Sequence, residues 1–444
     1  MITDASELMV SLLGRECVMP MESNLAYQVD GLVPKAVVQI QESSQIQAVL
    51  NLASQQDLGV TPWGGGTHQF LGNKPSRLDI VLDMHKYDRI LDFQPADLTV
   101  TVESGITLDK LKAQLISDDK LVPLESPLSG VATIGGIVAT NRSGPLRYSY
   151  GLPRDWLIGS TVCGAGGQQT KSGGKVVKNV TGYDLGKLYA GSLGTLGVIS
   201  EVTFKLVPSN PAGGLIVGKV DSIDEAVQIS KELFAKVYSP QGIQIVDNLA
   251  MKTIGHPLLH TGLTYGVMLF FCGRIPAVNR RMRECEGLLE SSGIISRQMF
   301  LSDEADKLLA QTTNAGSFAI DIPECLMKFN VSPDKLLAVA QRSQAILGNI
   351  PTALLADPGF GVIRLACDYS SIVSTSEFLA CVRSLRNMVS QHNGSLIIER
   401  CAYQVKEAID VWGDVTPEVK VMANIKKQFD PKMILNQGRF MGHL

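Results

Sequence analysis

The stretch from residue 130 to residue 144, GVATIGGIVATNRSG, constrains this chain most, because it combines many small residues with only a few apolar ones. Glycine allows the main chain to approach a ligand where a side chain would collide, and the threonine and asparagine side chains add hydrogen-bonding groups. Ile134, Ile137 and Val138 are spaced as if they pack against a flat ring. We interpret the stretch as a cofactor cradle; the alternative is a glycine-rich turn between strands.

Two further glycine clusters read PWGGGT at residues 62–67 and GSLGTLGVI at residues 191–199. Consecutive glycines offer successive backbone N–H groups, an arrangement that binds a pyrophosphate without lysine or metal. Three such loops indicate one long ligand built of several parts. The chain has neither the Gly-x-Gly-x-x-Gly run of a Rossmann site nor a Walker loop, which disfavours a nicotinamide on that fold and a magnesium nucleotide.

These clusters, together with KNVTGYDL at residues 178–185 and FDPKMILNQGR at residues 429–439, resemble the vanillyl-alcohol-oxidase-type flavoproteins, whose FAD-binding domain is called PCMH-type. The tail, from IERCA at residues 398–402 through Trp412 to residues 438–440, is most similar to the FAD-binding accessory subunits of bacterial glycolate oxidases. The resemblance covers nearly the whole chain. It implies an FAD-dependent oxidoreductase that acts on the CH–OH group of a 2-hydroxy acid.

The expected fold class is α+β. The pattern predicts strands at residues 36–40, 80–84, 98–103, 156–162 and 198–206, with helices at residues 43–53 and 108–116. We expect a lead-in helix in residues 1–30 and a two-part PCMH-type domain in residues 31–208. A cap domain follows in residues 215–415, an antiparallel sheet with helices on one face. The resemblance implies that the C-terminal helix and tail, residues 416–444, return to the FAD domain.

The residues expected to surround the FAD come from the three glycine clusters, from the segment just before residue 130 and from the tail. They are Pro62, Trp63, Gly64, Gly65, Gly66, Thr67, His68, Pro127, Gly130, Thr133, Ile134, Gly135, Gly136, Ala139, Thr140, Asn141, Gly144, Gly194, Gly197, Val198, Ile199 and Asn436. We expect a valine at Gly65 or Gly135 to remove the flavin and leave the chain folded, because its side chain would occupy the space of the ligand.

The attachment of the flavin is expected to be non-covalent. Thr67 stands where some members of the resembled superfamily carry the histidine that bonds to the flavin. His68 is one position away, and we interpret it as a polar residue beside the pyrophosphate; the alternative is a covalent anchor.

The sequence motifs do not identify the catalytic residues. Oxidation of a 2-hydroxy acid needs a base for the hydroxyl proton and usually an arginine for the carboxylate. The catalytic relatives use a His-x-Gly-Asp-Gly-Asn-x-His run, whereas the similar segment here, ADPGFGVIR at residues 356–364, has no histidine. The candidates for the arginine are Arg364, Arg400 and Arg439. Tyr183, Glu399 and Tyr403 are candidate bases, each with an alternative structural role.

No metal site is expected. His256 and His260 have the spacing of ligands on one helix face but lack the glutamate of a zinc-protease motif, so a surface helix end is favoured. The eight cysteines are dispersed, which excludes local ligand sets for zinc or an iron–sulfur cluster and predicts free thiols.

A net charge of -3 excludes a basic face for nucleic acid. The acidic start and the lack of a long apolar run predict a cytoplasmic protein, or one peripheral to the inner membrane through its partners. The resemblance implies a glycolate oxidase complex with a catalytic FAD subunit and an iron–sulfur subunit. The alternatives are a self-sufficient dehydrogenase of D-lactate or another small 2-hydroxy acid, and a scaffold without flavin, which the three glycine clusters disfavour.

Overall fold

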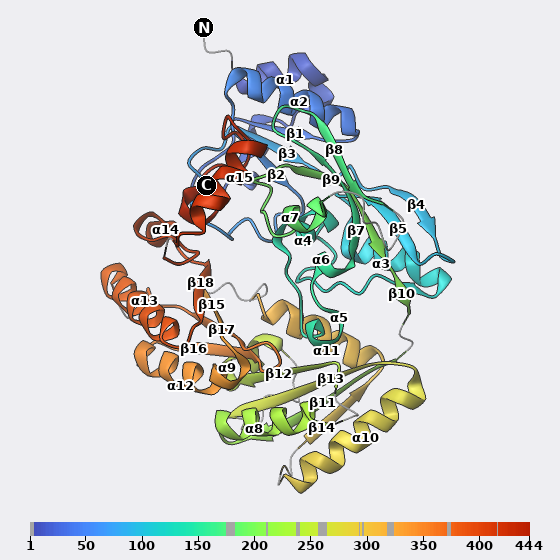
Figure 1. Ribbon diagram of the computed structural model, residues 1–444, viewed down its shortest axis with the longest axis vertical. Coiled ribbons are helices and arrows are strands. Elements are labelled where there is room, and N and C mark those ends of the chain that lie inside the picture. The colour runs from blue at the N-terminus through green and yellow to red at the C-terminus, as the bar shows by residue number, and fades with distance from the viewer. Residues whose placement is uncertain are drawn as a thin grey trace. The chain divides into compact units, whose positions relative to one another are not determined.

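The computed structural model describes residues 4–174, 183–209, 212–236, 240–255, 264–292, 294, 297–317, 324–370, 374–414 and 416–444 (Figure 1). The chain divides into two compact units. Unit 1 contains Met1–Arg142, Leu152–Pro208 and Lys406–Leu444, and unit 2 contains Ser143–Gly151 and Ser209–Val405. The units therefore differ from the expected domains in the segment Ser143–Gly151 and in the residues from Lys406 to 415. The pair His256 and His260 and most of the KNVTGYDL motif lie outside the described residues.

Unit 1 begins with a small parallel sheet in the order β1 (Ala36–Gln39), β3 (Ile80–Asp83) and β2 (Val60–Trp63). Helices α1 (Ala5–Leu13) and α2 (Ser43–Gln56) pack on it. The buried residues of α2 are Ile46, Val49, Leu50 and Ala53, the spacing of one helix face. The Gln45 side chain accepts a hydrogen bond from the Glu42 amide at 3.1 Å, which closes the start of this helix.

The second sheet of unit 1 is antiparallel and, in the described residues, runs in the order β4 (Ile90–Gln94), β5 (Thr99–Glu103), β9 (Val198–Lys205), β7 (Leu157–Cys163), β8 (Gln169–Gly173). Its core includes residues from α3 (Leu108–Leu115), α4 (Ile134–Thr140) and α7 (Leu185–Tyr189). The described part of unit 1 also contains α6 (Pro153–Trp156), α15 (Val419–Phe429), the short pair β6 (Lys120–Leu121) and β10 (Val207–Pro208), and 3-10 helices at Arg15–Cys17, Met21–Tyr27, Ile116–Asp118 and Met441–His443.

The C-terminal tail lies on the edge of the parallel sheet. The Val60 amide donates to the carbonyl of Ile434 at 2.7 Å, and the Asn436 amide donates to the carbonyl of Val60 at 2.8 Å. Ile434 and Leu435 are fully buried in the core of this sheet. The tail therefore ends beside the first glycine cluster, which directly follows β2.

Unit 2 is built on an antiparallel sheet of eight described strands. Their order is β14 (Arg297–Leu301), β11 (Ala212–Val220), β13 (Tyr265–Gly273), β12 (Gly242–Asp247), β16 (Thr352–Asp357), β17 (Val362–Cys367), β15 (Cys325–Asn330), β18 (Ser395–Arg400). The described helices are α5 (Arg147–Tyr150), α8 (Ile223–Phe234), α9 (Asn248–Ile254), α10 (Ile275–Ser291), α11 (Asp303–Ala315), α12 (Leu336–Leu347) and α13 (Thr375–Ser390); α14 (Tyr403–Ala408) spans the division between the units.

Helices cover both faces of this sheet, so the expectation of helices on one face was wrong. A Cβ built on Gly213 of β11 would meet Ala305 and Asp306 of α11, whereas one on Gly214 would meet Val278 and Met282 of α10. Neighbouring strand residues point to opposite faces, so α10 and α11 lie on opposite sides. Because β11 is buried on both faces, its sequence lacks the alternation of polar and apolar residues that marks a solvent-facing sheet.

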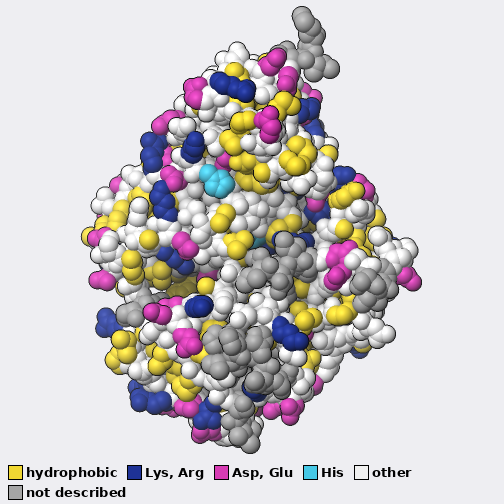
Figure 2. All heavy atoms as spheres, turned by 180° about the vertical axis from the view of Figure 1, so that it is seen from behind, with side chains coloured by type: hydrophobic (Ala, Val, Ile, Leu, Met, Phe, Trp, Pro, Cys, Tyr) yellow, Lys and Arg dark blue, Asp and Glu magenta, His cyan; other side chains and the backbone are white. Residues whose placement is uncertain are grey.

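The surface carries charges of both signs. On the face drawn in Figure 2, lysine and arginine side chains are interspersed with aspartate and glutamate side chains among the described residues. Such mixing provides no extended basic field there for a polyanion. Among the described residues, none of the helices is long and apolar enough to cross a membrane.

Candidate functional site

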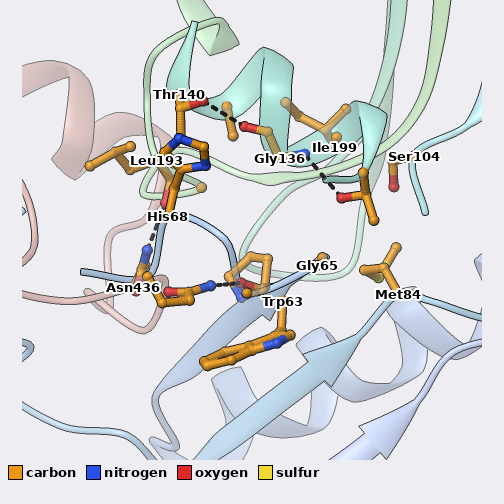
Figure 3. Close-up of a pocket in the computed structure, with 18 of the residues that line it drawn as sticks. Trp63, Gly65, His68, Met84, Ser104, Gly136, Thr140, Leu193, Ile199 and Asn436 are labelled. Atoms are coloured by element: carbon orange, nitrogen blue, oxygen red, sulfur yellow. Dashed lines mark hydrogen bonds between the residues drawn. The ribbon is translucent and has the colours of Figure 1, made fainter. Parts of the chain in front are cut away.

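A pocket with an empty volume of about 790 Å³, including the space at its open side, lies within unit 1 (Figure 3). Its lining comes from the end of β2 and the loop after it, from α4, from the loop before β9 and from the C-terminal tail. The structure therefore brings the three glycine clusters together around one cavity. The contact of each of these residues with FAD stays a prediction.

The first glycine cluster along the chain, residues 62–67, has backbone amides that make no hydrogen bond within the described protein. Among the described residues, no hydrogen bond has the amide of Gly64, Gly65, Gly66 or Thr67 as its donor. Gly66 adopts φ = +67°, a left-handed conformation that glycine adopts without strain. Consecutive unpaired amides beside a cavity form an anion site, and a diphosphate bridge matches it.

The second cluster, residues 130–144, contains the helix α4, and the expectation that its apolar residues pack against a flat ring was wrong. Ile134, Ile137 and Val138 point into the core of unit 1 and do not line the pocket. Their spacing of three and four residues is that of one helix face, and the Thr133 hydroxyl caps the helix by accepting from the Gly136 amide at 3.4 Å. The opposite face presents Gly136, Ala139 and Thr140 to the cavity.

The start of α4 does not offer free amides to a phosphate. The Ile134 amide donates to Ile106 at 2.9 Å, and the Gly135 amide donates to Ser104 at 2.7 Å. The helix therefore contributes surface to the pocket, and the anion-binding amides come from residues 64–67.

The third cluster is held by the tail. The Asn436 side chain donates to the Leu193 carbonyl at 2.6 Å and accepts from the Thr61 hydroxyl at 3.3 Å. Asn436 lines the pocket together with Leu193, Gly194, Gly197 and Val198. One amide side chain thus joins the third cluster to β2.

Several glycines are required by the protein itself. A Cβ on Gly65 would lie 2.0 Å from the Val131 carbonyl oxygen, and one on Gly135 would lie 2.7 Å from the Ser104 Cβ. The expectation that valine at these positions acts only on the ligand was wrong, because the side chain would first collide with the backbone or a neighbouring residue. A Cβ on Gly136, by contrast, meets only the Thr133 hydroxyl, at 3.3 Å.

Most of the expected cofactor residues line the pocket, and five do not: Pro127, Gly130, Ile134, Asn141 and Gly144. Asn141 ends α4 in a left-handed conformation, and its side chain accepts from the Arg154 amide at 3.1 Å. Gly144 belongs to unit 2.

The pocket also contains residues that the sequence did not predict as cofactor ligands. Met84 and Ser104 reach it from the ends of β3 and β5, Gln69 and Leu71 follow the first cluster, and Leu193 lies within the third. The glycines on either side of Leu193 could have indicated from the sequence that it lies at the pocket. No sequence pattern marks Met84 and Ser104, because only tertiary packing brings these strand ends to the cavity.

Thr67 and His68 both line the pocket. Their side chains are joined, with 2.9 Å between the Thr67 Oγ1 and the His68 Nδ1. His68 therefore lies beside the anion-binding loop and lines the same pocket as Thr67.

Of the three arginines, Arg439 lies in the pocket lining and is buried. Its guanidinium donates to the carbonyls of Gln69, at 2.7 Å, and Leu71. Burial lowers its pKa to about 10, so it stays charged at neutral pH. These contacts give Arg439 a structural role in the loop that follows the anion-binding amides.

Arg364 and Arg400 belong to unit 2. The Arg364 Nε lies 3.3 Å from a carboxylate oxygen of Glu399, and both side chains are largely buried. Burial lowers the pKa of Arg400. Glu399 is thus committed to an ion pair, which disfavours it as a base.

The other candidate bases are exposed. Tyr183 is 91% exposed and Tyr403 is also exposed, and neither lines the pocket. In the segment without histidines, the Asp357 carboxylate accepts from the amides of Gly359, at 3.0 Å, and Phe360, at 3.3 Å. Burial raises the pKa of Asp357 to about 6, but its bonds to the turn give it a structural role.

Among the described residues, histidine, cysteine and carboxylate side chains form no cluster that could hold a metal ion. All eight cysteines are free thiols, and Cys272 and Cys381 are the two that are not fully buried.

The chain is similar to known proteins in sequence and in structure. Residues 34–173 match the family model described as the FAD binding domain, and the chain accordingly binds FAD. The chain is 26% identical over 431 residues to the glycolate oxidase subunit GlcD of Bacillus subtilis (strain 168), an alignment that covers 92% of this chain and 89% of that protein. It is 32% identical over 213 residues to the glycolate oxidase subunit GlcE of Escherichia coli (strain K12), covering 47% of this chain and 60% of that protein.

The structure of p-cresol methylhydroxylase is similar in fold, with a TM-score of 0.76. The alignment covers 98% of this chain and 96% of that chain at 17% identity. A structure of alkyldihydroxyacetonephosphate synthase is also similar, with a TM-score of 0.73 at 15% identity over 98% of this chain and 86% of that chain. The expected fold, a PCMH-type domain with a second α+β domain built on an antiparallel sheet, is confirmed.

Proposed function

We propose that this chain is an FAD-dependent oxidoreductase that acts on the CH–OH group of a 2-hydroxy acid, with glycolate as the first candidate, and that it holds FAD without a covalent bond. The observation that carries the proposal is the row of amides at residues 64–67, which have no protein acceptor among the described residues and belong to residues that line the pocket of an FAD-binding domain. The similarity to glycolate oxidase subunits supports the substrate class.

The pocket residues fit FAD. The amides of residues 64–67 suit its diphosphate, and Gly136 and Ala139 leave room for its rings. FAD supplies the site that accepts a hydride when a hydroxy acid is oxidised. Thr67 carries a hydroxyl at the anchoring position, which supports non-covalent binding. Acid precipitation should release the flavin into the supernatant, and colour retained in the protein pellet would contradict this part.

Within this function, we favour an FAD-binding subunit of a glycolate oxidase complex that works with a catalytic flavin subunit and an iron–sulfur subunit. The segment at residues 356–364 lacks the histidines of catalytic relatives, and none of the three candidate bases, Tyr183, Glu399 and Tyr403, lines the pocket. A positioned base contributes about a hundredfold to ten-thousandfold in rate, so a partner that carries the base would complete the reaction.

The alternative is a self-sufficient FAD dehydrogenase of glycolate, D-lactate or another small 2-hydroxy acid. The alignment with the D-2-hydroxyglutarate dehydrogenase of Xanthomonas citri supports it, because that alignment covers 91% of this chain and 89% of that protein, whereas the match to GlcE covers only about half of this chain.

The test is anaerobic mixing of the FAD-loaded chain with glycolate and, separately, D-lactate, while the absorption of the flavin is followed. The subunit proposal expects slow or no bleaching until partner subunits are added. Rapid bleaching by the isolated chain would favour the self-sufficient dehydrogenase. A protein that binds no FAD in any preparation would refute both.

A further inference from the structure

Ser104 is a buried hydroxyl in the pocket wall that the protein does not use. It directly follows β5, lines the pocket and is 2% exposed. Its backbone is fixed, because its amide donates to Ser200 at 2.8 Å and its carbonyl accepts from Gly135 at 2.7 Å. Among the described residues, the Ser104 Oγ has no hydrogen-bond partner.

A buried hydroxyl without a partner costs about 1–3 kcal/mol, so its presence in a cavity indicates that a ligand supplies the partner. The neighbouring lining is apolar: Met84, Val198 and Ile199 are buried and offer no side-chain polar group apart from a thioether. This combination, a flat apolar slot with one hydroxyl, suits a heteroaromatic ring with hydrogen-bonding atoms on its edge.

FAD has two such rings, and burial distinguishes their places. In Figure 3, Ser104 lies at one end of the view, His68, Leu193 and Asn436 lie toward the other, and Gly65 of the anion-binding loop lies between them. At the Ser104 end, Ser104 and Met84 are buried. At the other end, His68, Thr140 and Leu193 are only half-buried, although Asn436 is buried. The flavin ring must be reachable by the hydroxy acid, so it belongs at the more open end, and the adenine belongs at the closed one.

We propose that the Ser104 hydroxyl hydrogen-bonds the adenine ring of FAD and is a positioning residue for the cofactor. The inference rests on the proposed binding of FAD in this pocket. It assigns an orientation to the cofactor: adenine beside Ser104, the diphosphate at residues 64–67, and the flavin toward His68 and Leu193.

The test compares Ser104→Ala with the wild type in titrations of the apoprotein with FAD and with ADP, which carries the adenine and diphosphate but no flavin. Loss of the hydrogen bond should weaken the binding of both ligands by roughly tenfold. The melting temperature of the apoprotein should stay equal or rise, because no protein contact is lost. The absorption band of the bound flavin should keep its position.

Ser160→Ala is the matched control. Ser160 is also buried, and its hydroxyl also has no partner among the described residues, but it does not line the pocket. This variant should bind FAD and ADP as the wild type does. If Ser104→Ala does not fold, the nearly isosteric Ser104→Cys serves in the same titrations, with the same expected direction.

Unchanged ADP affinity in Ser104→Ala would overturn the proposal. A loss of FAD affinity together with a shifted flavin band, at unchanged ADP affinity, would place Ser104 at the flavin and also overturn it. A wild-type apoprotein that takes up no FAD would refute the proposed function itself, an outcome that the wild-type titration separates from failure of the inference.

Discussion

Lys426 and Asp430 form an ion pair one helical turn apart, with 2.6 Å between Nζ and Oδ2, although both side chains are almost completely buried. The ammonium also donates to the carbonyls of Thr195, at 2.7 Å, and Leu435, at 2.8 Å. The carboxylate accepts from the amides of Ile434 and Leu435. One buried pair therefore joins α15, the third glycine cluster and the tail that carries Asn436.

We predict that Lys426→Met destabilises the protein and weakens FAD binding. It leaves a buried carboxylate without its counter-charge and two carbonyls without a donor, a loss of about 3–5 kcal/mol in the free energy of unfolding. Because the tail positions Asn436, FAD affinity should also fall. Denaturant unfolding and FAD titration measure the two effects.

Lys187→Met is the control for this prediction. Lys187 and Asp184 are 3.1 Å apart with both side chains more than half exposed, so their pair contributes little. Equal unfolding curves for Lys426→Met and the wild type would contradict the role of the buried pair.

The glycine clusters could be recognised from the sequence because runs of glycine indicate that the backbone comes close to a ligand or to another segment. The clusters do gather around one pocket. Glycine content does not reveal what occupies the space that a side chain would need. At Gly65 it is the Val131 carbonyl, whereas at Gly136 it is the cavity. That distinction depends on contacts between segments far apart in the chain.

The helix α4 illustrates a competing signal. Two glycines in seven residues disfavour a helix by about 1 kcal/mol each, and favour the interpretation as a loop. The cap by Thr133 and the burial of Ile134, Ile137 and Val138 outweigh that cost. Tertiary burial decided the conformation, and it cannot be read from local composition.

Gly136→Ala should separate cofactor binding from folding. Its added methyl group meets only Thr133 within the protein and otherwise extends into the pocket that Gly136 lines. Replacing glycine in a helix stabilises it by up to about 1 kcal/mol, so the apoprotein should be as stable as the wild type or more stable. FAD affinity should fall at least tenfold, as measured by titration.

Gly287→Ala provides the comparison, because Gly287 also lies in a helix, α10, and a Cβ there meets nothing within 4 Å. It should leave FAD affinity unchanged. Wild-type affinity in Gly136→Ala would mean that this face of α4 does not contact the cofactor.

Asp247 should make the stability of unit 2 depend on pH. Its carboxylate accepts from the amides of Ala250, at 2.7 Å, and Leu354, at 2.9 Å, and joins β12 to β16. Burial nevertheless raises its pKa from 3.8 to about 6. Between these values the folded state binds more protons than the unfolded state, so the free energy of unfolding falls as the pH rises from about 4 to about 6.

The contribution of Asp247 to this fall is roughly 3 kcal/mol. Asp247→Asn cannot titrate, and its pH dependence of unfolding should be flatter by that amount over this window. Denaturant unfolding at pH 4, 5, 6 and 7 provides the measurement. Parallel curves for the variant and the wild type would show that Asp247 titrates as an exposed carboxyl does.

Arg439 should prove to position the cofactor site, not to bind the substrate carboxylate. Its guanidinium is buried and already donates to the carbonyls of Gln69 and Leu71, so Arg439→Met leaves both acceptors unsatisfied, at a cost of about 2–4 kcal/mol in the free energy of unfolding. The loop after the anion-binding amides should loosen, and FAD affinity should fall. Arg439→Lys keeps the charge but not the planar fork of the guanidinium, and should give intermediate losses of stability and of FAD affinity.

Once either Arg439 variant is saturated with FAD, its affinity for glycolate, followed through the flavin spectrum, should equal that of the wild type. A variant with normal FAD affinity and weakened glycolate binding would instead restore Arg439 as a ligand of the substrate.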